Sequence, residues 1–337
     1  MTALGILWFI LIFVLIIGYF VLDGMDLGVG VLYPFLGKDA RSKQVMLKAV
    51  GPIWDGNEVW LLTAGGALFA AFAPAYATSF SGFYLAIMLV LFGLILRAVA
   101  VEFRYAGEDH AKLWDVLFFV GSLLPALLFG VAVGNVIAGL PLDANGDYTG
   151  SFFALLNPFA LLCGVLGLVH MLVQGASWTA AKSEVESDLH KRAACLRTKL
   201  AVVELVVFVL VSLLFLFMVV PNSVVGLAIG PLAIVFAILY LAGLAGVFAC
   251  NSADGKRDVL AVVFAGVSCL GMVGMWAAAT FPYLIPATVA DMSVTVASAA
   301  SSDTSLTAMT IIACIGVPLV LAYHVIVYRI FRGRIPA

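Results

Sequence analysis

Long apolar runs separated by short polar segments make up most of the chain. A bilayer's hydrocarbon core is about 30 Å thick, and a helix needs about 20 apolar residues to cross it. Nine runs meet this requirement and predict helices at 4–34, 52–73, 77–101, 113–136, 153–179, 200–220, 228–250, 258–280 and 307–330. The pattern therefore indicates an all-α integral membrane protein in which residues 1–337 form a single polytopic membrane domain.

The beginning of the chain departs from this simple pattern. The first run is too long for one straight crossing, and it contains the polar interruption Asp23-Gly24-Met25-Asp26. No basic segment precedes this run, which is long enough to span rather than to be removed as a signal peptide. Near the other end, segment 281–306 is rich in Ser, Thr and Ala, and we expect it to fold over the outer face.

Composition supports a membrane location. Apolar residues make up 64% of the chain and charged residues only 11%, against about 45–50% and about 25% in soluble domains. Lipid must therefore cover most of the exterior. The net charge of −2 gives no indication of a nucleic-acid partner. The five cysteines form no CxxC pair, so we expect neither a metal site nor a disulfide framework.

The positive charges predict the orientation. All 17 Lys and Arg residues fall in or beside alternate connections, at 38–48, 97–112, 182–199, 256–257 and 329–334. The opposite connections, 135–151, 221–229 and 281–306, contain none. Because cytoplasmic loops are enriched in Lys and Arg, a nine-helix topology has its N-terminus outside and its C-terminus in the cytoplasm. Eight or ten helices would scatter the basic residues over both sides.

Four acidic residues carry the candidate chemistry. Asp23 and Asp26 lie in the first predicted helix, and Asp55 and Glu58 in the second. Carboxyl groups are costly in hydrocarbon and mark functional sites, and a spacing of three places each pair on one helix face. With Asp23 near mid-membrane and Asp55 nearer the cytoplasm, the four predict a proton path. Asp23 and Asp55 are each followed by glycine, which allows close approach or a kink and favours a functional role.

A structural role is the alternative for some of these acids. Arg97, near the cytoplasmic end of the third predicted helix, is an expected ion-pair partner for Glu58 or Glu102. Asp26 and Glu58 are therefore as well explained by pairing with a base, or by capping a broken helix, as by proton transfer.

Histidine is scarce in the predicted helices. Only His170 and His324 lie within them. A membrane haem usually takes His or Met as axial ligands. His170 is better explained as a polar contact between helices, so we expect no haem ligand in this chain.

Two segments resemble the signature segments of subunit II of cytochrome bd-type quinol oxidases. They are residues 22–30, LDGMDLGVG, and residues 51–61, GPIWDGNEVWL. The likeness continues through 63–71 and 80–84, and is weaker at 156–159, 174–176 and 281–286. It covers essentially the whole chain, and the WDGNEVWL run is long and unusual enough to be highly specific.

The resemblance implies a fold and an assembly. Subunit II of this family has two four-helix bundles plus one peripheral helix. It pairs with a similarly folded subunit I, which holds two b-type haems, one d-type haem and the quinol-oxidising loop. The complex lies in the cytoplasmic membrane of a bacterium or archaeon, oxidises quinol and reduces oxygen to water. Expected partners are subunit I, quinol, membrane lipid and, in some complexes, a small single-helix subunit.

The resemblance also assigns roles to residues. Asp23 and Asp55 match the family's acidic positions along a proton path, and Trp60 matches a tryptophan near a described oxygen route. A structural quinone is a further expectation, since some subunits II hold one. Two other functions stay open. One is a stand-alone secondary transporter or ion channel that uses the same carboxyls with its first helix broken at Asp23-Gly24; the other is a scaffold only.

Overall fold

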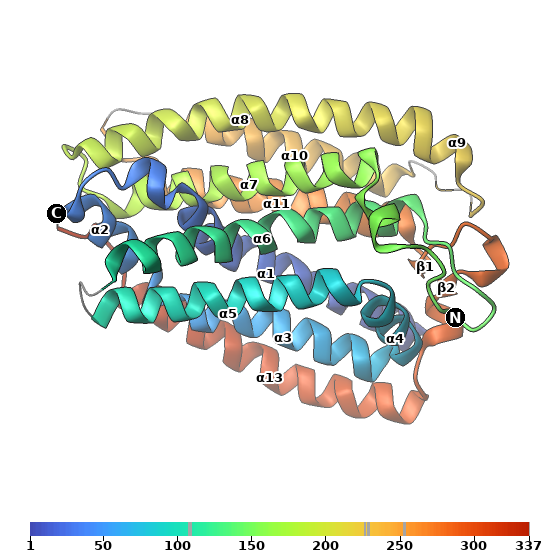
Figure 1. Cartoon of the computed structure of the whole chain (residues 1–337). Coiled ribbons are helices and arrows are strands. Elements are labelled where there is room, and N and C mark those ends of the chain that lie inside the picture. The colour runs from blue at the N-terminus through green and yellow to red at the C-terminus, as the bar shows by residue number, and fades with distance from the viewer. Residues whose placement is uncertain (107–109, 226, 228–229, 252–253, 337) are drawn as a thin grey trace.

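The computed structural model describes residues 1–106, 110–225, 227, 230–251 and 254–336. Its long helices lie side by side (Figure 1). In chain order the elements are α1 (Ala3–Leu36), α2 (Ala40–Val50), α3 (Trp54–Ala71), α4 (Ala73–Gly82), α5 (Tyr84–Ala106), α6 (Ala111–Ala138), the 3-10 turn η1 (Phe152–Leu156), α7 (Pro158–Lys182), α8 (Asp188–Leu214), the π-helical turn η2 (Phe215–Val219), α9 (Val220–Asn222), α10 (Pro231–Ala249), α11 (Asp258–Thr280), β1 (Tyr283–Ile285), the 3-10 turn η3 (Ala290–Met292), β2 (Val294–Thr295), α12 (Val296–Ala299) and α13 (Asp303–Ile330).

Within the described ranges, eight helices are long and apolar enough to cross a membrane: α1, α5, α6, α7, α8 continued through α9, α10, α11 and α13. The second predicted helix corresponds to α3. It has 18 residues, and Asp55, Asn57 and Glu58 near its start make it less apolar than the eight. The count of nine crossings and the orientation stay predictions.

The helices form two groups. One contains α1, α3, α5 and α6, and the other contains α7, α8, α10 and α11. Helix α1 also packs on α7, and α6 on α7, which joins the groups. Helix α13 lies along α3 at the edge of the first group (Figure 1), and among its described residues only Leu306 and His324 are buried. The division into two four-helix bundles plus one peripheral helix stays a prediction.

Close backbone contact holds α1 against α7. A Cβ atom on Gly28 would lie 1.9 Å from the carbonyl oxygen of Met171, and one on Gly175 would lie 2.3 Å from the backbone of Gly28. Only residues without side chains allow this approach, which is how membrane helices pack without a hydrophobic driving force. Helix α1 runs unbroken through Asp23-Gly24, so the break required by the transporter hypothesis is absent from this described helix.

Two predicted helices are divided in the structure. The helix expected at 77–101 is α4 followed by α5, which meet at Phe83, where the backbone leaves helical geometry. The helix expected at 153–179 begins only at Pro158. There the side chain of Asn157 caps α7 by accepting from the backbone N–H of Ala160, at 2.9 Å. Proline fits the first helical turn because its missing N–H is not needed there.

A third predicted helix begins earlier than expected. The helix expected at 200–220 is longer, because α8 begins at Asp188 behind an N-cap serine, Ser187, and its charged first turns are helical. The start expected at 228 lies outside the described residues, and α10 is described from Pro231.

Helix α2 was not predicted, because it is too short to cross a membrane and polar on one side. It packs on α1 and α7 and buries Val45, Met46 and Leu47. Asp39 caps it, accepting from the backbone N–H and the hydroxyl of Ser42 at 2.8 and 2.7 Å. These hydrogen bonds, first that of the backbone N–H, hold the pKa of the Asp39 carboxyl below its usual value.

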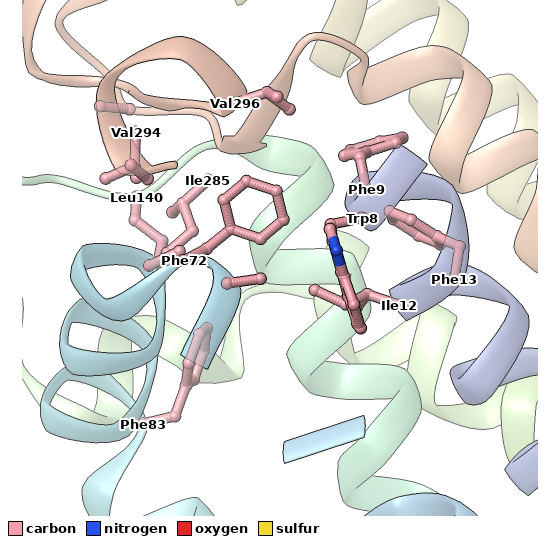
Figure 2. Packing of buried hydrophobic residues seen from close by; sticks show 14 of the residues in the cluster. Trp8, Phe9, Ile12, Phe13, Phe72, Phe83, Leu140, Ile285, Val294 and Val296 are labelled. Carbon is pink, nitrogen blue, oxygen red and sulfur yellow. The ribbon is translucent and has the colours of Figure 1, made fainter. Parts of the chain in front are cut away.

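The segment before α13 folds back onto the N-terminal part of α1. Its strands β1 and β2 pair antiparallel. Figure 2 shows the cluster that forms there, which includes Trp8, Phe9, Ile12, Phe13, Phe72, Phe83, Leu140, Ile285, Val294 and Val296. The indole N–H of Trp8 donates to the carbonyl of Leu306 and the hydroxyl of Thr310, at 3.2 and 3.0 Å. The expected outer segment is thus an ordered cover.

At the other end, which carries α2 and the C-terminus and is called the basic end below, the last residues fold back onto the second group (Figure 1). The guanidinium of Arg334 donates to the carboxylate of Asp258 at 2.9 Å and to the carbonyls of Ser183 and Gly255 at 2.5 and 2.8 Å. This C-terminal clasp connects the end of α13 to the start of α11.

Asp258 has further buried partners. His190 lies 2.8 Å and Arg197 3.1 Å from its two carboxylate oxygens. All three side chains are at most 3% exposed. These partners compensate the buried charge of Asp258. The C-terminal clasp is therefore attached to a carboxylate that α8 already holds in place.

Candidate functional site

A buried ion-pair network lies between α1, α3 and α5. Arg97 of α5 donates from Nη1 to Oδ1 of Asp23 at 2.7 Å, and from Nη2 to the carboxylate of Glu58. The side chains of Arg97 and Asp23 are 1% and 0% exposed, and that of Glu58 is 22% exposed. Helix α1 packs against both α3 and α6, and α6 packs against α5. Arg97 on α5 therefore lies near enough to reach carboxyls on α1 and α3.

Asp26 belongs to the same network without touching the guanidinium. Its Oδ2 accepts from the side-chain amide of Asn57 at 2.7 Å, and Oδ1 of Asn57 accepts from the hydroxyl of Tyr328 at 3.2 Å. In the part of the chain that the structure describes, the second carboxylate oxygens of Asp23 and Asp26 are buried without a hydrogen-bond partner. We call Asp23, Asp26, Asn57, Glu58 and Arg97 the acidic cluster.

The charge balance of the acidic cluster is uneven. The cluster holds three carboxyls, of which Asp23 and Glu58 contact its one guanidinium, so full ionisation would leave a surplus of two negative charges. Unpaired buried charge is very costly. A group of this kind is suited to taking up and releasing protons as its surroundings change.

Two predicted site residues lie outside the acidic cluster. Asp55 is exposed on the first turn of α3. Glu102 is exposed on α5 and accepts from the indole N–H of Trp54 at 3.3 Å. Of the two expected partners for Arg97, the structure brings Glu58 to it and not Glu102, and it adds Asp23.

Trp60 is buried between α3, α1 and α13. Its ring packs against Gly18, where a Cβ atom would lie 2.1 Å from the indole. The indole N–H donates to Nε2 of His324 at 3.2 Å, and Nδ1 of His324 lies 2.9 Å from the carbonyl of Val320. The peripheral helix α13 is thus connected to the first group at the level of Trp60.

The second group has its own polar centre, the His170 cluster of His170, Glu204 and Tyr240. Nδ1 of His170 lies 2.9 Å from Oε1 of Glu204, and the hydroxyl of Tyr240 donates to the same oxygen at 3.1 Å. His170 is thus a polar contact between helices, as expected. The contact between His170 and Glu204 could have been predicted, because each is an isolated ionisable residue in one of two consecutive predicted helices.

A cavity of about 350 Å³ adjoins this cluster. It lies between α6, α7, α8, α10 and α11, and its lining includes Phe129, Phe159, Phe208 and Met272 together with His170. Among the described residues, Nε2 of His170 is buried without a hydrogen-bond partner. The cavity is therefore mainly apolar, and Nε1 of Trp276 in its lining is likewise buried without a hydrogen-bond partner among the described residues.

Comparison with known proteins identifies the family. The family described as cytochrome bd terminal oxidase subunit II matches residues 4–331. A probable cytochrome oxidase subunit 2 of Haemophilus influenzae is 36% identical, over 99% of this chain and 96% of that protein. The cytochrome bd-I ubiquinol oxidase subunit 2 of Escherichia coli is 35% identical, over 99% and 95%. The cytochrome bd ubiquinol oxidase subunit 2 of Bacillus subtilis is 34% identical, over 99% and 98%.

A solved structure supports the fold. A chain of the bd oxidase from Geobacillus thermodenitrificans superposes with a TM-score of 0.79, covering 98% of this chain and 99% of that one at 13% identity. Together with the eight apolar helices, these relatives place the protein in the bacterial inner membrane as a multi-pass respiratory-chain component. The chain belongs to the cytochrome bd terminal oxidase subunit II family.

Proposed function

We propose that this subunit serves a quinol-oxidising, oxygen-reducing complex by supplying protons from the cytoplasm and by stabilising a haem-bearing subunit I. The observation that carries the proposal is the acidic cluster, which holds three carboxyls and one guanidinium, the latter in contact with Asp23 and Glu58. Oxygen reduction to water consumes protons, and a group of carboxyls with more acid than base can hold them inside the membrane.

The exposure of the carboxyls decreases along the proposed path. Asp55 is exposed, the side chain of Glu58 is 22% exposed, and Asp23 and Asp26 are fully buried. A proton taken up at Asp55 would move to Glu58 and then to the buried pair. Arg97 contacts Glu58 and Asp23 at once, so it orients the outer and inner parts of the path.

The exposed face of α3 is the proposed contact with subunit I. It carries Asp55, Val59, Leu62, Gly66 and Phe69. A carboxyl facing lipid is costly, whereas one facing a protein partner can be hydrated or paired. Gly66 has open space around it, so a partner helix can approach closely. A small single-helix subunit remains an expectation.

The cofactors divide between the subunits in this proposal. The two b-type haems and the d-type haem belong to subunit I, where they supply electron transfer and oxygen chemistry. The residues of this chain fit a structural quinone in the cavity beside His170, because its apolar wall suits an isoprenoid tail and Nε2 of His170 has no hydrogen-bond partner in the described part of the chain. Trp60, packed among Leu15, Tyr19 and Ala64, lies on a proposed apolar route for oxygen.

The transporter or channel alternative is less well supported, because α1 is continuous through Asp23-Gly24. The scaffold alternative makes a different prediction from ours. It expects substitutions of Asp23 to change assembly alone, whereas a proton path expects turnover to fall in complexes that are fully assembled.

The test uses the purified complex with its haem-bearing partner. We expect Asp23→Asn to lower quinol oxidase turnover about 100-fold, as loss of an acid–base group does. Asp55→Asn should cost about fivefold, because water can partly replace an exposed carboxyl. Proton uptake should fall in parallel while the haem spectrum is retained. Asp303→Asn, an exposed acid at the start of α13, is the matched control. Full turnover and uptake in both variants would contradict the proposed path.

A further inference from the structure

One face of α1 carries polar residues that the proposed proton path does not use. Tyr19, Asp23, Asp26, Gly30 and Tyr33 follow at intervals of four, three, four and three residues, so they share one side of the helix. The acidic cluster takes up the middle of this stripe. The positions of Gly30 and Tyr33 continue it toward the basic end of the molecule, where α1 ends at Leu36.

A serine of α6 fills the place of the missing side chain at Gly30. A Cβ atom on Gly30 would lie 1.9 Å from Oγ of Ser122. Ser122 is 0% exposed, and in the described part of the chain its hydroxyl has no hydrogen-bond partner. A buried hydroxyl therefore lies against α1 about halfway between Asp26 and Tyr33.

Tyr33 is the next polar group along the stripe. It is 0% exposed, and its hydroxyl is likewise buried without a hydrogen-bond partner among the described residues. Nζ of Lys43 lies 5.6 Å from the centre of its ring and 2.6 Å from the carboxylate of Asp115. Arg104 approaches the same carboxylate at 3.1 Å. The side chains of Lys43 and Asp115 are 28% and 15% exposed, so these ion pairs connect Tyr33 to the surface.

The spacing of these groups matches bridging water. Helices rise 1.5 Å per residue, so the backbone positions of Asp26, Gly30 and Tyr33 follow at about 6 and about 4.5 Å along the axis, and Ser122 faces the middle one. One water molecule that accepts and donates spans about 5.5 Å. Buried polar atoms without protein partners are commonly satisfied by ordered water.

We propose that this stripe is a second proton entrance, which leads from the Lys43–Asp115–Arg104 ion pairs through Tyr33 and Ser122 to Asp26. The inference rests on the proposed function of the acidic cluster. Each hydroxyl accepts one proton and gives up another, so a proton taken from the cytoplasm arrives at the carboxyl of Asp26 and leaves no charge behind. Asn57 relays a proton less readily than a hydroxyl, because its amide would have to convert to the imidic acid form.

The two entrances differ in what encloses them. The path through Asp55 and Glu58 opens on the exposed face of α3, which the proposed partner would cover. The second entrance is built from side chains of α1, α2, α5 and α6 of this chain, and it opens at the part-exposed ion pairs of Lys43 and Arg104 with Asp115. Removing either entrance should therefore leave partial uptake through the other.

The alternative is that Tyr33 and Ser122 only fill space. Tyr33 does meet Phe118 edge to face, with ring centres 5.2 Å apart. A buried hydroxyl without a partner destabilises a fold. Under this alternative, Tyr33→Phe would leave proton uptake unchanged and keep or raise the melting temperature.

The experiment measures proton uptake by the intact complex in vesicles during quinol oxidation. Ser122→Ala and Tyr33→Phe are made in the wild-type chain and in the Asp55→Asn chain. We expect each to slow uptake only slightly alone and about fivefold more in the Asp55→Asn background, the change produced by losing one hydrogen-bonded step. Ser177→Ala is the matched control, because Ser177 is equally buried but donates to the carbonyl of Val173 in its own helix, at 2.7 Å.

The outcomes separate the two proposals. If Ser122→Ala and Tyr33→Phe behave like Ser177→Ala in both backgrounds while Asp23→Asn stops uptake, the second entrance is wrong and the proposed function stands. If Asp23→Asn keeps full uptake, the proposed function itself fails. Should Ser122→Ala not assemble, Tyr33→Phe decides, because it removes one hydroxyl and leaves the ring packing intact.

Discussion

The acidic cluster and the His170 cluster are both buried polar centres between helices, one in each group, yet their charge balance differs. The acidic cluster has three carboxyls and one base, and its exposure grades from buried Asp23 to part-exposed Glu58. The His170 cluster pairs one base with one acid, both at most 2% exposed, and borders an apolar cavity.

The difference shows how similar packing supports two kinds of polar centre. A balanced pair such as His170 and Glu204 satisfies its charges locally and can remain in one state. A cluster with surplus acid must keep part of its acid protonated or meet a large electrostatic cost. In the proposed function, excess acid and a route to the surface are the features that separate a transfer site from a structural contact.

The largest expected effect comes from removing the base of the acidic cluster. Arg97→Leu leaves the carboxyls of Asp23 and Glu58 without a counter-charge, and breaking a buried pair costs about 3–5 kcal/mol. We expect loss of assembled complex, measured by its yield and its melting temperature. The double substitution Arg97→Leu with Asp23→Leu should recover part of the loss. No recovery in the double variant would mean that the two residues do not act as a pair.

A smaller effect is expected in the second group. Glu204→Gln keeps the shape of the side chain but removes its charge, so the contacts to His170 and Tyr240 should weaken by about 1–3 kcal/mol. The melting temperature should fall while protons taken up per oxygen remain unchanged. A change in that ratio would show that the His170 cluster also transfers protons, and the comparison would then lose its basis.

The smallest effect should come from the N-cap of α2. This helix packs on α1 of the first group and on α7 of the second. Asp39→Ala removes the N-cap, which should cost about 1 kcal/mol. Because hydrogen bonds from Ser42 lower the pKa of Asp39 in the folded chain, its contribution is complete above the usual carboxyl pKa and is lost as pH falls through the lowered value. Thermal melts of the wild type and the variant should therefore converge on acidification. Asp291→Ala, an exposed acid outside both groups, is the control.

Much of the helical architecture could be predicted, because an apolar run long enough to cross a bilayer has few other structures available. The family and the membrane location could likewise be predicted from the residues of segments 22–30 and 51–61. Local breaks were harder. The run expected at 77–101 has no proline or charged residue near Phe83, and α2 is half polar, so neither leaves a signal in a search for long apolar segments.

The partners within the candidate site could be predicted only in part. Arg97 and Glu58 both lie near one predicted membrane boundary, so their pairing could be expected. The pairing of Arg97 with Asp23 depends on how α1 and α5 approach each other across 74 residues of chain. The exposure of Asp55 depends on the rotation of α3 about its own axis, which its weak amphipathicity leaves undefined. The role of Asn57 could not be predicted, because an uncharged amide gives no ionisable signal beside Asp55 and Glu58.

The C-terminal clasp has a consequence for biosynthesis. Arg334 follows every long helix of the described chain in sequence, and it joins the carboxylate of Asp258 to the turn that follows α7. During synthesis, these helices can therefore be inserted before this contact exists, and the second group lacks it until Arg334 has been added. A chain truncated just before Arg334 would keep every long helix yet leave the carboxylate of Asp258 without this partner.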